Sequence, residues 1–323
     1  MAEAAGAPRR AVVSVDLDEW YHCRWATGAA HSRWPDTAAV FREHYHSDRP
    51  GGELVGPTRR ILDLFERHRL RGSFFILGEV ATHYPELVRE IAARGHEIGC
   101  HGFHHVDADL LGPEGFAREL AEARRVLEPL VDGPLTGYRA PNLLLRDWMI
   151  PTLRAQGFDH DVSVCTSRGL LGKDFGHAHQ ADNPYRFRER FALPDPQGDL
   201  VEIPLPTFPF LRLPAATGIL TRVAGVRWTT VALGHALRGG DVQYYFHPYE
   251  MGPRPAVPLG LRERVFLRRL GPWMEAAVDR ILGTLRGWGV EFVTASQMAA
   301  AQRAAPRPGS SGQEAAAGRG FPG

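Results

Sequence analysis

Two histidines four residues apart stand at the end of a short apolar stretch, in the segment GHEIGCHGFHH (residues 95–105). The segment begins with the alternating pattern of a β-strand, and His101 and His105 follow where that strand would end. Imidazole nitrogens bind zinc-like ions at about 2.0–2.1 Å, and a pair at i and i+4 can reach a single ion. The same spacing also arises by chance in a chain with fifteen histidines. Because the pair follows a strand end, we nevertheless predict a metal at His101 and His105, and we place His96 and His104 outside the site.

Two acids occupy the end of the first predicted strand, which reads SVDLDE (residues 14–19). Because side chains alternate across a strand, Asp16 and Asp18 face one side and the apolar residues between them face the other. Two close carboxylates favour a cation between them, or a division of labour in which one binds metal and the other carries protons; a solvated strand end is the alternative. With His101 and His105, Asp18 completes a set of two histidines and one carboxylate, which leaves coordination positions open for water and substrate.

Three further strand ends carry polar residues where an apolar residue would be ordinary. They read YRAP, DHDVSV and YFHP, and they supply Arg139, Asp161 and His247. Taken singly, these residues are explained by a surface arginine, a strand cap and a buried histidine. Because the chemistry of a (β/α) barrel gathers at the carboxyl ends of its strands, we expect the three side chains to lie beside the metal pair.

The elements that must position these residues alternate along the chain. Strand patterns are predicted at residues 11–16, 73–78, 96–100, 135–139, 159–164, 200–204, 242–247 and 290–294. Helical patterns are predicted at residues 57–70, 79–94, 113–131, 146–156 and 263–288. This alternation implies a mainly parallel sheet, and about eight strands in roughly 300 residues predict a distorted (β/α) barrel of seven or eight strands. A doubly wound open sheet is the alternative, but no GxGxxG follows a strand.

The chain is predicted to hold one main domain between two short flanking segments. The domain, the N-terminal extension and a tail rich in Gly, Pro, Ser and Ala that we expect to be disordered are residues 11–300, 1–10 and 301–323. Loop 19–56 is long enough to form a lid, and residues 205–240 are predicted to be an insert. Within that insert, residues 206–228 mix apolar and basic side chains, so contact with a membrane surface is an alternative to ordinary packing over the barrel.

Composition excludes several classes of protein. With 38 basic and 37 acidic residues the net charge is +1, so no general field attracts nucleic acid or an anionic membrane. No stretch approaches the roughly 20 apolar residues of a transmembrane segment. The three cysteines are odd in number and form no CxxC pair, which argues against a disulfide framework or a zinc ribbon. Because the first residues lack the apolar run of a secretory signal, we expect a reduced, cytoplasmic protein; its oligomeric state is not indicated.

The segments SVDLDEW, HGFHH, YRAP, DHDVSV and YFHP resemble, in order and spacing, the five motifs of the polysaccharide deacetylase superfamily. This superfamily is also called the NodB-homology domain or carbohydrate esterase family four. The resemblance extends over about residues 11–296 and implies metal-dependent removal of an N-acetyl or related N-acyl group from an amino sugar. Many members carry two adjacent aspartates in the first motif, whereas Leu17 separates the two acids here, as in a spaced DxD subset. Alternation favours Asp18 over Glu19 as the metal-binding acid, and both stay open.

The resemblance implies a role for each motif residue. The expected ligands of one divalent ion, with zinc favoured over iron, cobalt, nickel or manganese, are Asp18, His101 and His105. Asp16 would act as general base, and Arg139 would pair with it. His247 would protonate the departing amine, and Asp161 would keep that histidine charged and oriented. The residues expected at the substrate are Trp20, Tyr21, Pro141 and Tyr245, although packing of the lid would explain its aromatic residues nearly as well.

A cytoplasmic enzyme of this kind would act on a small-molecule or lipid-linked amino sugar, such as a nucleotide sugar, a lipid-linked intermediate or a natural-product glycoside. A deformylase or another hydrolase of linear or cyclic amides is the nearest alternative, since the same metal-activated water would attack those bonds. A non-haem iron oxygenase also uses two histidines and a carboxylate, but it would need no proton-transfer residues. An inactive carbohydrate-binding protein would have no reason to keep every acid and base of the motifs.

Overall fold

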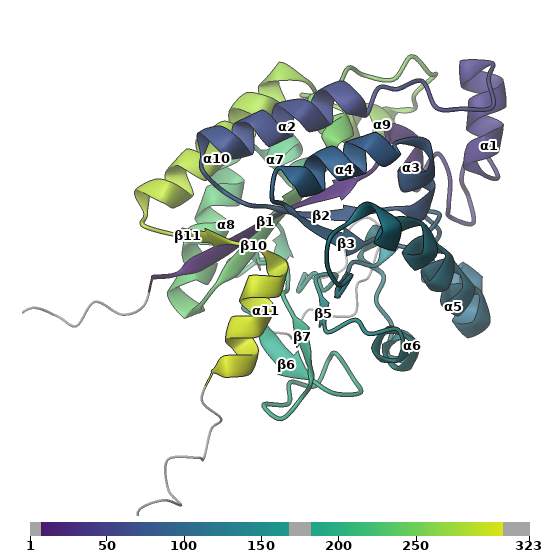
Figure 1. Ribbon diagram of the computed structural model, residues 1–323. Helices are drawn as coiled ribbons and strands as arrows, with labels where there is room; N and C mark the ends of the chain where they lie inside the picture. Colours follow the sequence, from purple (N-terminus) through teal and green to yellow (C-terminus); the bar gives the residue numbers. More distant parts are fainter. Residues whose placement is uncertain (1–7, 168–181, 306–323) are drawn as a thin grey trace, which may run out of the picture.

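The computed structural model of the chain describes residues 8–167 and 182–305 (Figure 1). Most of the predicted tail, residues 306–323, and residues 1–7 of the predicted extension lie outside the described residues. The domain is longer at both ends than predicted, because its first strand begins at Arg10 and its last helix continues to Ala304.

A curled, mainly parallel sheet forms the centre of the molecule. Its strands are β1 (Arg10–Leu17), β2 (Ser73–Ile76), β3 (Glu97–Cys100), β4 (Gly137–Tyr138), β5 (His160–Asp161), β6 (Tyr185–Phe187), β7 (Leu200–Glu202), β10 (Val242–Phe246) and β11 (Glu291–Val293). Their order is β10-β1-β2-β3-β4-β5-β7-β6, and β11 also pairs with β1. Among the described strands of this sheet, only β6 is antiparallel to its neighbour. Within the described chain no strand pairing joins β6 or β7 to β10, so the sheet forms an incompletely closed barrel, which confirms the predicted fold class.

Helices cover the outside of this sheet (Figure 1). They are α1 (Thr37–Val40), α2 (Val55–Arg67), α3 (Gly78–His83), α4 (Pro85–Ala93), α5 (Ala108–Leu127), α6 (Ile150–Ala155), α7 (Gly218–Ala224), α8 (Val226–Gly239), α9 (Leu261–Phe266), α10 (Pro272–Gly287) and α11 (Ala295–Ala304). The described residues also contain six single helical turns: Trp20–His22 (η1), Phe41–Tyr45 (η2), Glu128–Leu130 (η3), Pro141–Leu143 (η4), Asp147–Met149 (η5) and Pro248–Met251 (η6). None of the helices among the described residues is both long and apolar enough to cross a membrane.

Two of the predicted helices are each divided in two by proline. The predicted helix 79–94 becomes α3 and α4, because Pro85 opens a new first turn. The predicted helix 263–288 becomes α9 and α10, because Gly271 adopts a left-handed φ of 69° and Pro272 begins the second helix. These breaks leave α9 free to lie across the mouth of the barrel.

Strand β1 separates two buried clusters by the alternation of its side chains. Val13, Val15 and Leu17 belong to the large cluster between sheet and helices. Val12 faces the barrel interior, where it joins apolar residues of β2, β7 and β11 and of α11, which covers the amino-terminal end of the barrel (Figure 1). Further along the same face the side chains are polar, beginning with the buried Ser14. The barrel interior is therefore apolar at one end and polar at the end toward which β1 runs.

The segment predicted as an insert, residues 205–240, belongs mainly to the helical layer. Helix α8 packs against β10 and α10, and its buried residues recur at helical spacing: Thr229, Ala232, Leu233, Ala236 and Leu237. The hairpin of β8 (Thr207–Phe208) and β9 (Leu213–Pro214) forms a separate small sheet. The ring of Phe208 stacks on that of Trp228, with 3.9 Å between the ring centroids. The segment predicted as an insert therefore contributes α7 and α8 to the helical layer that packs on the barrel.

An ionic cluster centred on the buried His160 lies at the starts of the strands. His160 lies 2.6 Å from Asp159 through Nδ1 and 3.3 Å from Glu97 through Nε2. Burial alone would lower the pKa of His160, but the interactions with Asp159 and Glu97 outweigh burial and raise that pKa from 6.5 to about 9. Burial likewise opposes the shift of Glu97, whose hydrogen bonds to His160, Ser296 and Ser73 lower its pKa to about 2. Both shifts favour the charged pair in the folded protein.

We expect the His160→Gln variant to be less stable than the wild type by about 3 kcal/mol at pH 6, and by clearly less at pH 9.5. The sign follows from the raised pKa of His160: its contribution is fully present below its ordinary value and is lost as the pH rises through about 9. Urea denaturation at the two pH values measures the difference. His68→Gln is the matched control, because its partner Asp279 is exposed. An equal deficit at both pH values would contradict the assignment.

Candidate active site

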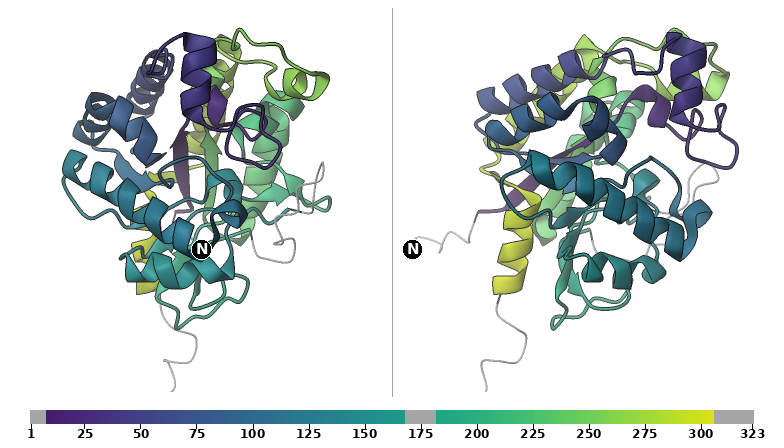
Figure 2. Two further views of the ribbon diagram at one scale, coloured as in Figure 1. Left: turned by 90° about the vertical axis from the view of Figure 1, so that its right-hand side faces the viewer. Right: turned by 45° about the vertical axis from the view of Figure 1, so that its right-hand side comes forward.

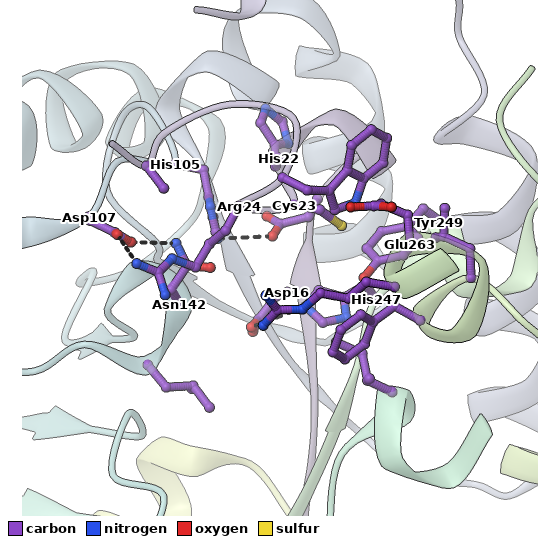
Figure 3. A pocket seen from close by; sticks show the side chains of 18 of the residues that line it. Asp16, His22, Cys23, Arg24, His105, Asp107, Asn142, His247, Tyr249 and Glu263 are labelled. Atoms are coloured by element: carbon purple, nitrogen blue, oxygen red, sulfur yellow. Dashed lines mark hydrogen bonds and ion pairs between the residues drawn. The ribbon is translucent and has the colours of Figure 1, made fainter. Parts of the chain in front are cut away.

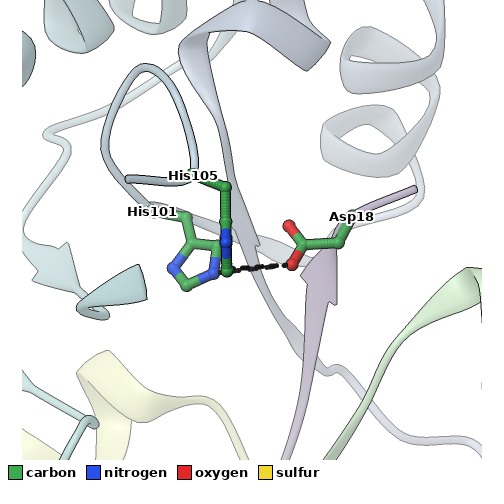
Figure 4. Close-up of side chains that lie close together, drawn as sticks. All are labelled: Asp18, His101 and His105. Carbon is green, nitrogen blue, oxygen red and sulfur yellow. Dashed lines mark ion pairs between the residues drawn. The ribbon is translucent and has the colours of Figure 1, made fainter. Parts of the chain in front are cut away.

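Three candidate metal ligands meet at the carboxyl ends of β1 and β3 (Figure 4). Asp18 follows β1, His101 follows β3, and His105 lies in the loop before α5. The carboxylate oxygen Oδ2 of Asp18 lies 3.3 Å from Nε2 of His105 and 3.8 Å from Nε2 of His101. One ligand atom from each residue lies within 4.8 Å of the other two, and all three residues are buried. The structure thus brings together the three residues expected to hold a metal.

The polar atoms of this group fit a divalent cation. Nδ1 of His101 lies 2.8 Å from the carbonyl oxygen of Arg139. Because a carbonyl only accepts, Nδ1 carries the proton and the lone pair of Nε2 faces Asp18. Within the described structure, Nε2 of His101 and Oδ1 of Asp18 are buried and have no hydrogen-bond partner. Buried acceptors without partners are costly, and a cation between them would satisfy both.

Glu19, the other acid considered for this role, points elsewhere. Its carboxylate accepts hydrogen bonds from the Leu54 backbone N–H at 3.1 Å and from the Tyr84 hydroxyl at 3.3 Å. Burial raises the pKa of Glu19 to about 8. Glu19 therefore anchors the segment after β1 to the start of α2, and Asp18 is the acid that faces the histidines.

Asp16 is held on one side and open on the other. Its Oδ1 pairs with Nη1 of Arg139 at 2.6 Å. Its Oδ2 lies 3.9 Å from Nε2 of His101 and 3.9 Å from Nε2 of His247. Asp16 and Asp18 both face His101, as strand alternation predicted. The free oxygen of Asp16 is thus placed between the candidate metal ligands and His247.

Arg139 is fully buried and its surroundings fix its position. Its Nη2 donates to Ser14 Oγ and to Gln243 Oε1, both at 2.8 Å. Its guanidinium lies between the rings of Phe75 and Tyr245, at 4.8 and 4.7 Å from their centroids. The predicted pairing of Arg139 with Asp16 is found, and Arg139 has little freedom to leave it.

His247 contacts a different acid from the one expected. Its backbone N–H donates to Oε2 of Glu250 at 2.9 Å, and its Nδ1 lies 3.4 Å from the same oxygen. Burial alone would lower the pKa of His247, but Glu250, with smaller contributions from Asp16 and Asp18, outweighs burial and raises it. The predicted pairing with Asp161 is therefore wrong, and Glu250 is the acid that faces this histidine.

Asp161 supports the turn of the third motif instead. It accepts hydrogen bonds from the backbone N–H of Ser163 at 2.8 Å and from its hydroxyl at 2.9 Å. The Ser163 hydroxyl in turn accepts from the Ala140 N–H at 2.7 Å. Glu202 lies beside Asp161, and burial raises the pKa of both carboxyl groups. The aspartate thus acts on the Arg139 turn, because strand β5 ends on that side of the barrel.

A cavity of about 850 Å³ opens in front of these residues (Figure 3). Its lining includes Asp16, Asp18, His105 and His247 from the barrel, and residues of the lid and of α9. We use the term lid for residues 19–54, since α2 begins at Val55 rather than after residue 56. The lid and α9 gather on the side toward which β1 points (Figure 2). The cavity is therefore bounded by the barrel below and by these two segments above.

The lid is seated directly on the loop that carries His105. Gly28 of the lid has a left-handed φ of 79°, and a Cβ there would lie 1.8 Å from the carbonyl oxygen of His105. Asp107 joins three parts of the site, because its carboxylate accepts from Arg24 of the lid at 2.5 Å and from Asn142 at 2.8 Å (Figure 3). These contacts hold the lid over the cavity.

The residues predicted to contact the substrate divide into two groups. Tyr245 lines the cavity. Trp20 and Tyr21 do not line it, because they are 4% and 2% exposed and pack inside the lid's own aromatic cluster. Pro141 is buried behind the surface of the cavity, against Gly102. The explanation of the lid aromatics as packing residues therefore holds for Trp20 and Tyr21, whereas Trp25 of the lid lines the cavity.

Several residues of the site were not identified from the sequence. Gln243 and Glu202 are polar residues within apolar strand patterns, and this irregularity could have found them. Glu250 lies three residues after His247, at the spacing of a helix cap, which is a weaker signal. Arg222 lies in the segment interpreted as an insert and had no signal of its own.

Comparison with known proteins supports the motif assignment. Residues 50–160 match the family model described as Polysaccharide deacetylase, and this segment contains His101, His105 and Arg139. A Bacillus cereus peptidoglycan-N-acetylglucosamine deacetylase is 25% identical over 133 residues, which cover 36% of this chain and 47% of that protein. A Sinorhizobium fredii chitooligosaccharide deacetylase is 34% identical over 70 residues, which cover 22% of this chain and 33% of that protein. The chain thus matches less than half the length of these relatives.

The fold agrees over a much longer part of the chain. A crystal structure of a Mycobacterium smegmatis protein assigned to the polysaccharide deacetylases superimposes with a TM-score of 0.61. The alignment covers 94% of this chain and 95% of that one, at 20% identity, a level at which the likeness concerns the fold. The family match thus covers the second and third motifs, and the barrel carries all five motifs at one end; in these respects the chain is similar to the polysaccharide deacetylase superfamily, the proteins with a NodB-homology domain.

Proposed function

We propose that this protein is a metal-dependent hydrolase that removes an N-acetyl group from a small amino sugar. The observation that carries the proposal is the buried group of Asp18, His101 and His105 with the free oxygen of Asp16 beside it. Three protein ligands leave coordination positions for water and substrate, as in catalytic rather than structural sites. The names of the two relatives, which denote deacetylases of N-acetylated amino sugars, support this class of substrate.

The protein groups have the positions that amide hydrolysis needs. A divalent ion bound by the three ligands would polarise the amide carbonyl and lower the pKa of a water molecule. Asp16 accepts the proton of the attacking water, while Arg139 holds its other oxygen in place. The water oxygen bonds to the carbonyl carbon, the carbon–nitrogen bond breaks, and Nε2 of His247 gives its proton to the departing nitrogen. The products are acetate and the free amino sugar.

The size and lining of the cavity support a small substrate. A volume of about 850 Å³ lies within the range of pockets that enclose small molecules. Trp25, Tyr245 and Tyr249 line it, and aromatic rings of this kind stack on the apolar faces of sugars. The lid covers the cavity from one side, which favours one or a few sugar rings over the middle of a polymer chain. A nucleotide sugar, a lipid-linked intermediate and a natural-product glycoside all meet these conditions.

The proposal is tested by acetate release from a panel of UDP-N-acetylamino sugars and short N-acetylated oligosaccharides, with zinc, iron, cobalt, nickel or manganese added. We expect release from at least one small amino sugar, dependent on metal and abolished by a chelator. An N-formyl sugar and a cyclic amide belong in the same panel. Turnover of these two alone would move the assignment to another amide hydrolase, and turnover of long polymer alone would contradict the small substrate.

A further inference from the structure

A buried arginine–glutamate pair lies directly behind His247. Nε and Nη2 of Arg222 both contact Oε1 of Glu250, at 2.9 and 2.8 Å, and neither residue is exposed to solvent. The other oxygen of Glu250, Oε2, accepts from the backbone N–H of His247 at 2.9 Å and lies 3.4 Å from its Nδ1. The carboxylate is thus divided, with one oxygen for the guanidinium and one for the histidine.

The local structure is built around this pair. Gly218, the first residue of α7, touches the carboxylate so closely that a Cβ there would lie 1.9 Å from Oε2 of Glu250. Arg222, one turn later on α7, also donates through Nη1 to the carbonyl oxygens of Arg268, at 2.9 Å, and of Phe266. With these backbone contacts added, the guanidinium cannot turn away from Glu250. The same arginine therefore fixes both Glu250 and the chain around the end of α9.

The position of Glu250 determines what His247 can do. With Nδ1 facing Glu250, Nε2 points toward the cavity and lies 3.9 Å from Asp16 Oδ2. The rings of Tyr245 and Tyr249 pack on the imidazole at 5.3 and 5.0 Å between centroids, so its orientation is constrained on both sides. A carboxylate at Nδ1 favours the imidazolium, the form that can donate a proton from Nε2.

We propose that Glu250 and Arg222 are positioning residues for His247, and that protonation of the departing amine depends on this pair rather than on Asp161. The inference rests on the proposed function, since it assigns His247 the role of proton donor. Glu250 acts on the imidazole, and Arg222 acts on Glu250 by supplying the charge that keeps a carboxylate stable at full burial. Asp161 is occupied by Ser163, whose hydroxyl accepts from the Ala140 N–H of the Arg139 turn, so Asp161 supports that turn rather than His247.

The test uses two acyl compounds that differ in their need for a proton. The nitrogen of an amide must be protonated as the carbon–nitrogen bond breaks, whereas the nitrophenolate of 4-nitrophenyl acetate leaves as an anion. We expect Glu250→Gln to lower kcat for the amide by about 10²-fold, the lower end of what general acid catalysis contributes. Hydrolysis of the ester should change by less than about threefold, since it requires the metal-bound water and Asp16 but not His247. A merely structural role would lower both rates together.

Further variants locate the effect. His247→Ala should reproduce the split between amide and ester, and Arg222→Lys, which keeps a charge but loses the two-nitrogen contact, should show the same split more weakly. If Glu250→Gln does not fold, as judged by circular dichroism, the ratio in Arg222→Lys decides. Glu97→Gln is the matched control, because it removes a carboxylate that is only 11% exposed at the opposite end of the barrel; its amide-to-ester ratio should equal that of the wild type.

The outcomes separate this inference from the proposed function. The amides in the assay are the best N-acetylamino sugar and 4-nitroacetanilide. Hydrolysis of the anilide with the expected split, but of no amino sugar, would leave the inference standing and overturn the substrate class. Equal losses on amide and ester in Glu250→Gln, or a split in Asp161→Asn alone, would overturn the inference and leave the deacetylase proposal intact. A wild type that cleaves the ester and no amide would overturn both.

Discussion

Replacing Asp16 by asparagine is expected to lower kcat for acetate release by about 10³-fold, with metal still bound. Asparagine keeps the shape of the side chain and can still accept the hydrogen bond from Arg139, but it cannot take a proton from water. The ligand set of Asp18, His101 and His105 is untouched, so metal content should stay at the wild-type value. Acetate release under saturating substrate, measured together with the metal content of the same sample, checks both parts.

Asp241→Asn is the matched control for this variant. Asp241 is also a buried carboxylate paired with an arginine at 2.6 Å, in this case Arg10 at the start of β1, and Asp241 itself directly precedes β10. Loss of that pair should alter stability but leave kcat within about twofold of the wild type. A similar kcat in Asp16→Asn and the wild type would remove Asp16 from the mechanism, and a loss of metal would show that it is a ligand instead.

The His101→Ala variant is expected to lose the metal and, with it, acetate release down to background. One of three ligands disappears, and Asp18 and His105 alone would hold the ion at least about 10²-fold more weakly, the upper limit for loss of an outer-shell partner. Metal content after dialysis gives the first measurement, and titration of the metal-free protein with zinc gives the second. Adding excess zinc should restore only a small part of the activity.

His104→Ala provides the comparison within the same histidine cluster. Its side chain is half-exposed and pairs with Glu119 at 2.8 Å, away from the three ligands. We expect its metal content and kcat to equal those of the wild type. If His104→Ala lost the metal and His101→Ala kept it, the site would have to be placed on the outer surface of this loop.

The sequence was sufficient to locate the candidate metal site because its residues follow strand ends. Alternation along β1 placed Asp16 and Asp18 on one face, and parallel strands bring their carboxyl ends to one side of a barrel, where His101 and His105 also stand. The pairing of Asp16 with Arg139 was implied by the resemblance of the motifs, and the structure contains it. These relations depend on strand direction and register, which a regular fold determines.

The errors concern contacts that strand order does not determine. Which acid faces His247 depends on a single turn after β10 and on the approach of α7, so Glu250 replaced Asp161. Trp20 and Tyr21 could have faced a sugar, but the gain from burying large rings inside the lid prevailed. In contrast, the break of the helix at Gly271 and Pro272 was readable from the sequence, since glycine followed by proline is a common boundary.

The incomplete closure of the barrel has a consequence for how the protein can vary. Between β10 and the neighbouring strands β5 and β7 the backbone ladder is missing, and the amide of Gln243 reaches across to the carbonyl oxygens of Val162 and Ile203. The candidate metal ligands, Asp16 and His247 lie in or after β10, β1 and β3, which belong to the unbroken run β10-β1-β2-β3. The circumference of the barrel can therefore change at the gap between β10 and the strands β5 and β7. Sequences that descend from this chain can in this way acquire wider or narrower cavities, while the reacting groups keep their spacing.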